Sequence, residues 1–258
     1  MNLKKYKLGS PFLALFLISI QTALADCPRA LEQMKGIHFI DLQQVISEEY
    51  GQQLFEILEK HRDVDFWPSY KRRFFYSVFM QRPHQTFRFF DRDTEKRDSF
   101  GDQTAIENIR IWQKQEQMNL EPLIEAVQQL TGYSTTLKKQ GIVITSLALV
   151  EIRRYAQNLK VDHMEIQRHK DAGPFITFVI TLHGPTTQVS MSKTLLGSLF
   201  SKWVDAPPLT AIGFFGKPPK GTRACNWPQS LVHRGRKPGP QGRLVLIVRY
   251  DCELASNH

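Results

Sequence analysis

One stretch decides the fold, and it runs Arg168-His169-Lys170-Asp171-Ala172, then Gly173-Pro174, then Phe175-Ile176-Thr177-Phe178-Val179-Ile180-Thr181-Leu182. Its second half is rich in β-branched and aromatic residues, so it predicts a buried strand. Its first half places a histidine and a carboxylate, in a His-x-Asp pattern, just before that strand. Polar pairs at strand ends are what the mouth of a small β-barrel presents, so this stretch predicts a barrel with polar groups at its opening.

A second polar set follows downstream. His233 lies in Leu231-Val232-His233-Arg234-Gly235, and Arg243 comes ten residues later in Gly242-Arg243-Leu244. Leu244-Val245-Leu246-Ile247-Val248 predicts another buried strand. Two histidines and one carboxylate are the ligands of the facial triad that holds non-haem Fe(II) and leaves open coordination positions. The two sets together therefore indicate a metal site.

These segments resemble the Fe(II)/2-oxoglutarate-dependent dioxygenase superfamily over roughly residues 140 to 253. The resemblance implies an α+β fold: a distorted double-stranded β-helix, jelly-roll or cupin-like, with flanking N-terminal helices. It implies that His169, Asp171 and His233 hold Fe(II). Arg243 would bind the remote carboxylate of 2-oxoglutarate, and Tyr155 would donate a hydrogen bond to the same group. The implied reaction hydroxylates an unidentified substrate as 2-oxoglutarate is oxidatively decarboxylated to succinate.

Other interpretations of these residues remain open. His163-Met164-Glu165 is a second His-x-carboxylate pattern, although it lies farther from the strand that begins at Phe175. Without a metal, His169 and Asp171 would be loop residues, His233 a surface histidine, and Tyr155 a core residue. Arg243 and Arg249 are spaced as in the arginine pair of the nucleic-acid-demethylating branch of the superfamily, and positions six apart share one face of a strand. We do not assign that branch.

The N-terminus has the pattern of a secretory signal peptide. Three lysines precede an apolar run from Pro11 to Ile20, and Ala23-Leu24-Ala25 is a small-x-small cleavage site. We therefore expect residues 1–25 to be removed, leaving residues 26–258 as one exported domain, periplasmic or secreted, with no membrane span. An uncleaved membrane anchor is the alternative.

The part between residues 26 and 139 is expected to be mainly helical with aromatic strands. Residues 26–70 are expected to be mostly helical, because apolar residues between Leu42 and Leu58 keep a helical period, whereas Arg73–Met80 and Thr86–Phe90 read as two strands. Helices are expected from Thr104 and from Asn119 to Gly132, with Pro122 in the first turn of the second. Ile142–Tyr155 is then a strand. Gly213–Gly221 reads as a turn.

The net charge and the cysteines of the chain exclude few of the possible substrates and partners. The net charge of +9 falls to +6 without the three lysines of the signal peptide. A basic run follows His233 and could attract an anionic substrate or 2-oxoglutarate, but nucleic acid is a poor partner for an exported protein.

An exported chain permits a disulfide, so Cys252 could pair with Cys225 or Cys27, or all three thiols could be free. The substrate could be a peptide side chain, a lipid or a small metabolite. The competing functions are a non-catalytic, cupin-like binding module and an exported interaction factor.

Overall fold

The computed structural model describes residues 37–61, 64–65, 84–91, 101–133, 137, 141–157, 171, 173–190, 195–200, 202–218, 230 and 232–254. Its helices are α2 (Glu48–Leu58), α4 (Gly101–Glu116) and α5 (Glu121–Gly132). Its strands are β1 (Ile37–Asp41), β2 (Val64–Asp65), β3 (His84–Asp91), β4 (Ile142–Tyr155), β5 (Phe175–His183), β6 (Gln188–Ser190), β7 (Trp203–Asp205), β8 (Thr210–Phe215), β9 (His233–Arg234) and β10 (Arg243–Leu254). None of the helices in these ranges is long and apolar enough to cross a bilayer.

The strands form two sheets. The large sheet has the order β1-β8-β5-β10-β4-β3-β2, and the small sheet has the order β7-β6-β9. All described pairs are antiparallel except β2 with β3. After β5 the chain enters the small sheet for β6 and β7, returns for β8, crosses again for β9 and ends in β10. This alternation between two mostly antiparallel sheets is jelly-roll-like.

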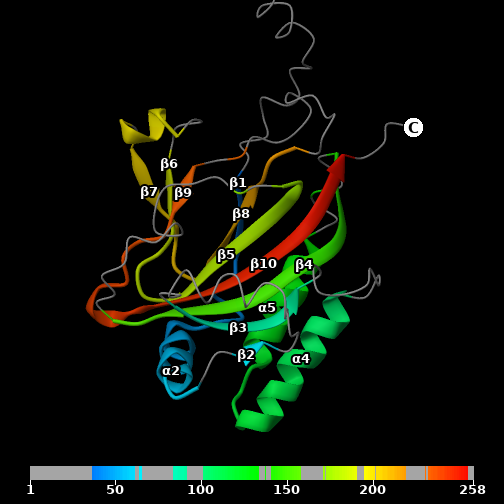
Figure 1. Cartoon of the computed structure of the whole chain (residues 1–258), viewed down its shortest axis with the longest axis vertical. Helices are drawn as coiled ribbons and strands as arrows, with labels where there is room; N and C mark the ends of the chain where they lie inside the picture. Colours follow the sequence, from blue (N-terminus) through cyan, green and yellow to red (C-terminus); the bar gives the residue numbers. More distant parts are fainter. Residues whose placement is uncertain are drawn as a thin grey trace, which may run out of the picture.

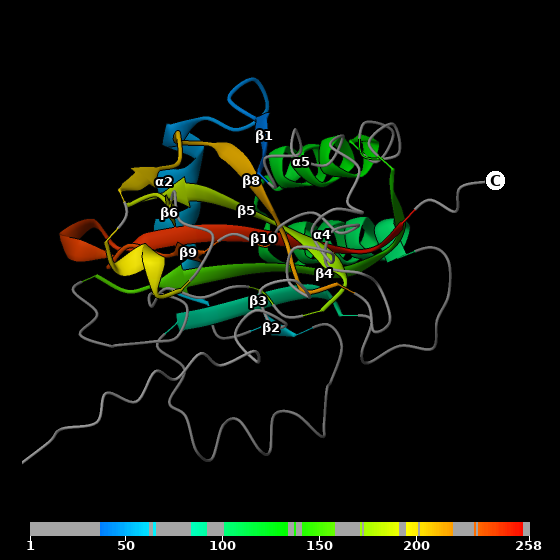
Figure 2. The same ribbon diagram turned by 90° about the horizontal axis from the view of Figure 1, so that it is seen from above.

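The helices and the small sheet lie on opposite sides of the large sheet (Figures 1 and 2). One core cluster joins all three helices to the large sheet, with Leu54 of α2, Trp112 of α4 and Leu123 of α5 among its members. A second, smaller cluster lies on the other side and joins Val189 of β6 to Phe214 of β8. The large sheet is therefore covered on both faces, by helices on one and by the small sheet on the other.

The long central strands divide their side chains between these two faces. In β10 the alternate residues Leu244, Leu246 and Val248 enter the helix-side core. Arg243, Val245, Ile247 and Arg249 line a pocket on the opposite side. Successive side chains of a strand point to opposite faces, so a single strand serves both.

Helix α2 is positioned by its first turn and by a close contact with the sheet. Ser47 caps the helix, since its hydroxyl accepts a hydrogen bond from the Tyr50 backbone amide, and acidic side chains follow in the first turn. Both features stabilise a helix N-terminus. A β-carbon at Gly51 would lie 1.8 Å from the carbonyl oxygen of Leu182, so only glycine lets α2 approach β5 this closely.

Most of the strands and helices expected from local pattern are present. The structure contains strands over Thr86–Phe90, Ile142–Tyr155, Phe175–Leu182 and Leu244–Val248, and helices over the ranges expected from Thr104 and Asn119. The run Arg73–Met80 lies outside the described residues, as do the signal peptide and its cleavage site.

Two expectations need correction, and an alternative left open for Cys252 is decided. The segment expected to be mostly helical begins, among the described residues, with strand β1, which exists because it pairs with the distant β8; the helical period that follows it corresponds to α2. Gly213 lies inside β8 rather than in a turn. Cys252 is a free, buried thiol, so it makes neither of the two disulfides considered for it. Burial raises the pKa of this thiol to about 12.

Candidate metal and 2-oxoglutarate site

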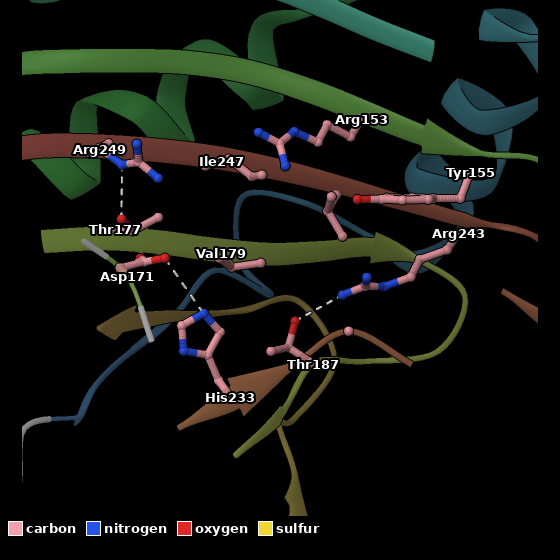
Figure 3. A pocket seen from close by; sticks show the side chains of 12 residues that line it. Arg153, Tyr155, Asp171, Thr177, Val179, Thr187, His233, Arg243, Ile247 and Arg249 are labelled. Atoms are coloured by element: carbon pink, nitrogen blue, oxygen red, sulfur yellow. Dashed lines mark hydrogen bonds and ion pairs between the residues drawn. The ribbon is translucent and has the colours of Figure 1, made fainter. Parts of the chain in front are cut away.

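A pocket between the two sheets collects polar residues from four strands and two loops (Figure 3). The large sheet contributes residues of β4, β5 and β10, and the small sheet contributes His233 of β9. Thr187 and Asp171 come from the loops before β6 and before β5. The lining residues are Arg153, Tyr155, Asp171, Thr177, Val179, Thr187, His233, Gly235, Arg243, Val245, Ile247 and Arg249.

Asp171 and His233 meet at one side of this pocket. The His233 Nε2 atom lies 3.9 Å from the Asp171 Oδ1 atom, and both side chains are largely buried. The two residues are far apart in sequence, so only the packing of the small sheet, which holds β9, against the large sheet brings them together. In the described part of the chain no third histidine, cysteine or acidic residue joins them in a potential metal cluster. His169 lies outside the described residues, as do His163 and Glu165 of the rival pattern.

His233 is held in one orientation by stacking and by strand pairing. Its ring lies parallel to that of Phe214, with 4.0 Å between the ring centroids. Its backbone is opposite Val189 in the pair formed by β9 and β6. The backbone is thus held by the small sheet and the ring by Phe214 of the large sheet, and Nε2 points toward Asp171 (Figure 3).

The Asp171 carboxylate has an unused oxygen. Its Oδ2 atom is buried and accepts no hydrogen bond from the described residues. A buried carboxylate oxygen without a partner is costly, unless a cation or a donor completes it. An imidazole nitrogen and a carboxylate on neighbouring side chains are a ligand pair suited to a divalent transition metal. Asp171 and His233 thus fit two ligands of the Fe(II) site that the sequence predicts.

Arg243 occupies the other end of the pocket. It is 3% exposed. Its guanidinium donates two hydrogen bonds of 2.9 Å each, one from Nε to the Pro185 carbonyl and one from Nη2 to the Thr187 hydroxyl. Its guanidinium carbon lies 5.7 Å from the centre of the Tyr155 ring. A cation flanked by two hydroxyl-bearing side chains is suited to a carboxylate, since both kinds of group donate hydrogen bonds to it.

The backbone just before Arg243 is tightly packed. Gly242 has a φ of 74°, and a β-carbon there would lie 2.2 Å from the Phe55 ring of α2. Both the conformation and the space require glycine. The start of β10, and with it the Arg243 side chain, is therefore held against α2 and the end of β5.

A buried carboxylate beneath the pocket neutralises Arg153. Glu151 is 0% exposed and forms ion pairs with Arg153 and with Arg88, whose Nη2 atom is 2.9 Å away. Burial by itself would raise the pKa of Glu151, but the two guanidinium groups outweigh it and lower that pKa below its ordinary value. Arg88 also pairs with Asp91 at 3.1 Å. The group of two arginines and two carboxylates is formally neutral.

The structure thus brings four of the five candidate residues, Tyr155, Asp171, His233 and Arg243, to one pocket. Sequence reasoning missed Arg153 and Thr187 in this pocket. Arg153 was open to prediction, because it lies two residues before Tyr155 and must share its face of β4. Thr187 carried no such signal, since it lies in a loop and reaches Arg243 only through the fold.

Comparison with known proteins finds similarity only among solved structures. No family model matches the chain, and no curated protein matches it. One similar structure is the dioxygenase for auxin oxidation 1 from Arabidopsis thaliana, a complex with 2-oxoglutarate; it has 13% sequence identity, covers 85% of each chain and has a TM-score of 0.48.

Two further similar structures are described as oxygenases or hydroxylases. A prolyl hydroxylase from Trichoplax adhaerens, in complex with a peptide fragment of the hypoxia inducible factor oxygen degradation domain, has 10% identity and a TM-score of 0.43, and the match covers 91% of this chain and 92% of that one. A putative oxygenase from Shewanella oneidensis has 14% identity and a TM-score of 0.42, with 89% of each chain covered. Similarity this distant leaves the function to be argued from the pocket's own residues.

Proposed function

We propose that this protein is an Fe(II)- and 2-oxoglutarate-dependent oxygenase that hydroxylates a substrate bound over the pocket. One observation supports this above all: Asp171 and His233 converge at one side of a pocket whose far end holds the buried cation Arg243. A metal-ligand pair and a carboxylate-binding arginine in one pocket are what a chelating keto acid needs. The finer fold that we propose is a double-stranded β-helix formed by the two sheets.

The metal ligands in this proposal are His169, Asp171 and His233. The Asp171 oxygen that lacks a partner among the described residues supports its role as a ligand, because coordination would satisfy it. Parallel stacking on Phe214 would keep the His233 ring in the orientation that coordination requires. Bound Fe(II) with 2-oxoglutarate would supply oxidative decarboxylation, in which dioxygen gives one oxygen atom to succinate and one to the hydroxylated product.

The remaining pocket residues bind and orient the co-substrate. The Arg243 guanidinium and the Thr187 hydroxyl would bind the remote carboxylate of 2-oxoglutarate, and the Tyr155 hydroxyl would add a hydrogen bond to it. Val179, Val245 and Ile247 form an apolar wall between the two ends of the pocket. Such a wall excludes water, and electrostatic interactions with the co-substrate are stronger where water is absent.

We also propose that the oxygenase is exported as a single domain of residues 26–258. Support comes from the basic, apolar and small-x-small segments of residues 1–25. Mass spectrometry of the protein recovered from its native host should find Asp26 as the first residue. Recovery of the protein with its first 25 residues intact would refute cleavage.

The oxygenase proposal is tested with the purified mature chain. We expect Fe(II)-dependent conversion of 2-oxoglutarate to succinate, even without the true substrate, through uncoupled turnover. Asp171→Ala and His233→Ala should each lose bound iron and with it this activity, while the circular dichroism spectrum stays unchanged. Asp205→Ala, a loss of an exposed carboxylate on β7, is the matched control and should keep both. Iron binding without any 2-oxoglutarate binding would favour the non-catalytic binding module instead.

A further inference from the structure

Among the described residues, Arg249 is a pocket-lining cation with no carboxylate partner. It lies on β10, and its Nε donates a hydrogen bond of 3.0 Å to the Thr177 hydroxyl. Its guanidinium carbon lies 4.3 Å from the centre of the Phe175 ring. In the described part of the chain no acidic side chain lies within 4.0 Å of it, and Asp171, which lines the same pocket, pairs with His233 instead.

The other two pocket arginines are already accounted for. Arg153 is neutralised by the buried Glu151. Arg243 is fixed by Pro185 and Thr187 and is assigned to 2-oxoglutarate under the proposed function. Arg249 differs from both, because it has no anion of the described protein segments to pair with and is not assigned to the remote carboxylate of 2-oxoglutarate.

Counted over the described lining residues, the pocket loaded with Fe(II) and 2-oxoglutarate would carry one excess positive charge. The two charges of Fe(II) cancel those of 2-oxoglutarate. Among the described lining residues Asp171 then carries one negative charge, Arg243 and Arg249 carry one positive charge each, and Arg153 is cancelled by Glu151. A surplus cation in a partly dehydrated pocket attracts an anion there.

Arg243 and Arg249 hold their guanidinium groups at opposite ends of the pocket. The two residues are six positions apart on β10, so their backbones are about 20 Å apart. Figure 3 shows Arg249 beside Thr177 and Asp171 at one end of the pocket, with Arg243 beside Tyr155 at the other and Ile247 between them. An anion that pairs with Arg249 would therefore lie near the metal end of the pocket, away from the group that Arg243 binds.

We propose that Arg249 binds an oxyanion group of the substrate, either a carboxylate or a phosphate ester, and so selects anionic substrates. This rests on the proposed oxygenase function, whose substrate class it defines. The contact of Nε with Thr177 and the position over the Phe175 ring hold the guanidinium plane, so that its two outer nitrogens present a fork. A planar fork matches the two oxygens of a carboxylate or phosphate, which a lysine ammonium cannot do.

The test measures binding of small oxyanions to the assembled pocket without turnover. Protein saturated with Fe(II) and 2-oxoglutarate under anaerobic conditions is titrated calorimetrically with benzoate, with phenyl phosphate and with neutral benzamide. We expect the wild type to bind at least one of the two anions more tightly than benzamide. Arg249→Gln should weaken that binding about 10- to 100-fold and leave 2-oxoglutarate affinity unchanged. Arg249→Lys should recover only part of the loss.

Controls separate this proposal from the oxygenase proposal itself. Arg110→Gln removes an exposed positive charge from α4, on the opposite side of the large sheet, and should change nothing. The tighter of the two anions identifies the substrate group as a carboxylate or a phosphate. Anion binding that is unaffected by Arg249→Gln, or a loss of 2-oxoglutarate affinity in that variant, overturns the anionic-substrate proposal alone. A wild type that binds Fe(II) but no 2-oxoglutarate overturns the oxygenase proposal as well.

Discussion

The two faces of the large sheet use the same strands for different purposes. On the helix side, Phe178, Leu246 and Tyr250 pack into an apolar core with α2, α4 and α5. On the pocket side, the next residues along the same strands, Thr177 and Arg249 among them, are polar and line the pocket. Because neighbouring residues of a strand face opposite ways, a change on one face should leave the other nearly untouched.

The adjacent pair Arg153 and Arg154 shows the same division with identical side chains. Arg153 faces the pocket and pairs with Glu151. Arg154 faces α2. Its Nε donates a hydrogen bond of 2.9 Å to the Phe55 carbonyl, and its guanidinium carbon lies 4.2 Å from the centre of the Phe55 ring. The role of an arginine here depends on its face of β4, and not on its chemistry.

Phe178→Ala should cause the largest loss of stability and leave the site intact. The Phe178 side chain is 0% exposed and packs edge-on against Tyr250, with 6.2 Å between the ring centroids. Truncation of a buried phenylalanine costs about 3–5 kcal/mol. Urea denaturation should show this loss, whereas iron and 2-oxoglutarate affinities measured without denaturant should be unchanged. Loss of both affinities in a variant that remains folded would contradict the separation of the two faces.

Arg243→Ala should show the converse effect. Loss of a buried charge-assisted pair costs about 2–5 kcal/mol, so the 2-oxoglutarate concentration required for half-maximal succinate formation should rise roughly 30-fold to several-thousand-fold. Arg243→Lys keeps the charge without the fork and should recover part of this. Iron binding should persist, because Arg243 is not a ligand. Arg249→Ala should change the 2-oxoglutarate requirement far less, and equal effects at the two arginines would assign both to the co-substrate.

His38 gives the smallest expected effect, and it concerns pH. It lies on the helix side, where a ring nitrogen is 2.9 Å from the Tyr133 hydroxyl and the ring contacts Phe215 edge-on. Burial lowers its pKa from 6.5 to about 4. The unfolded chain therefore takes up a proton below about pH 6.5, while the folded protein takes it up only near pH 4.

The consequence is a loss of stability as the pH falls through that window. The free energy of unfolding should decrease by about 3 kcal/mol between pH 7 and pH 4 through this group. His38→Gln should flatten this part of the pH profile in urea denaturation at a series of pH values, and 2-oxoglutarate affinity at pH 7 should not change. A profile of the same slope in the variant would assign the pH dependence to other groups.

Local sequence determined the long elements of this protein. Ile142–Tyr155, Phe175–Leu182 and Leu244–Val248 are rich in β-branched and aromatic residues, and strands β4, β5 and β10 follow from that composition alone. The same holds for α5, with Pro122 in its first turn and an apolar stripe along one face. The alternation of side chains along a strand also places Arg243 and Arg249 on one face from their spacing alone.

Only the tertiary structure decided how these pieces meet. β1 and β9 are too short to show a period, and each exists because a distant strand pairs with it. The approach of His233 to Asp171 depends on the crossing of β9, and the pairing of Arg153 with Glu151 depends on a burial that composition does not reveal. Side-chain type and spacing along the chain are local properties, so they can be predicted from the sequence. Whether a charge finds a partner among the described segments, as Arg153 does and Arg249 does not, is a property of contacts that the chain acquires only on folding.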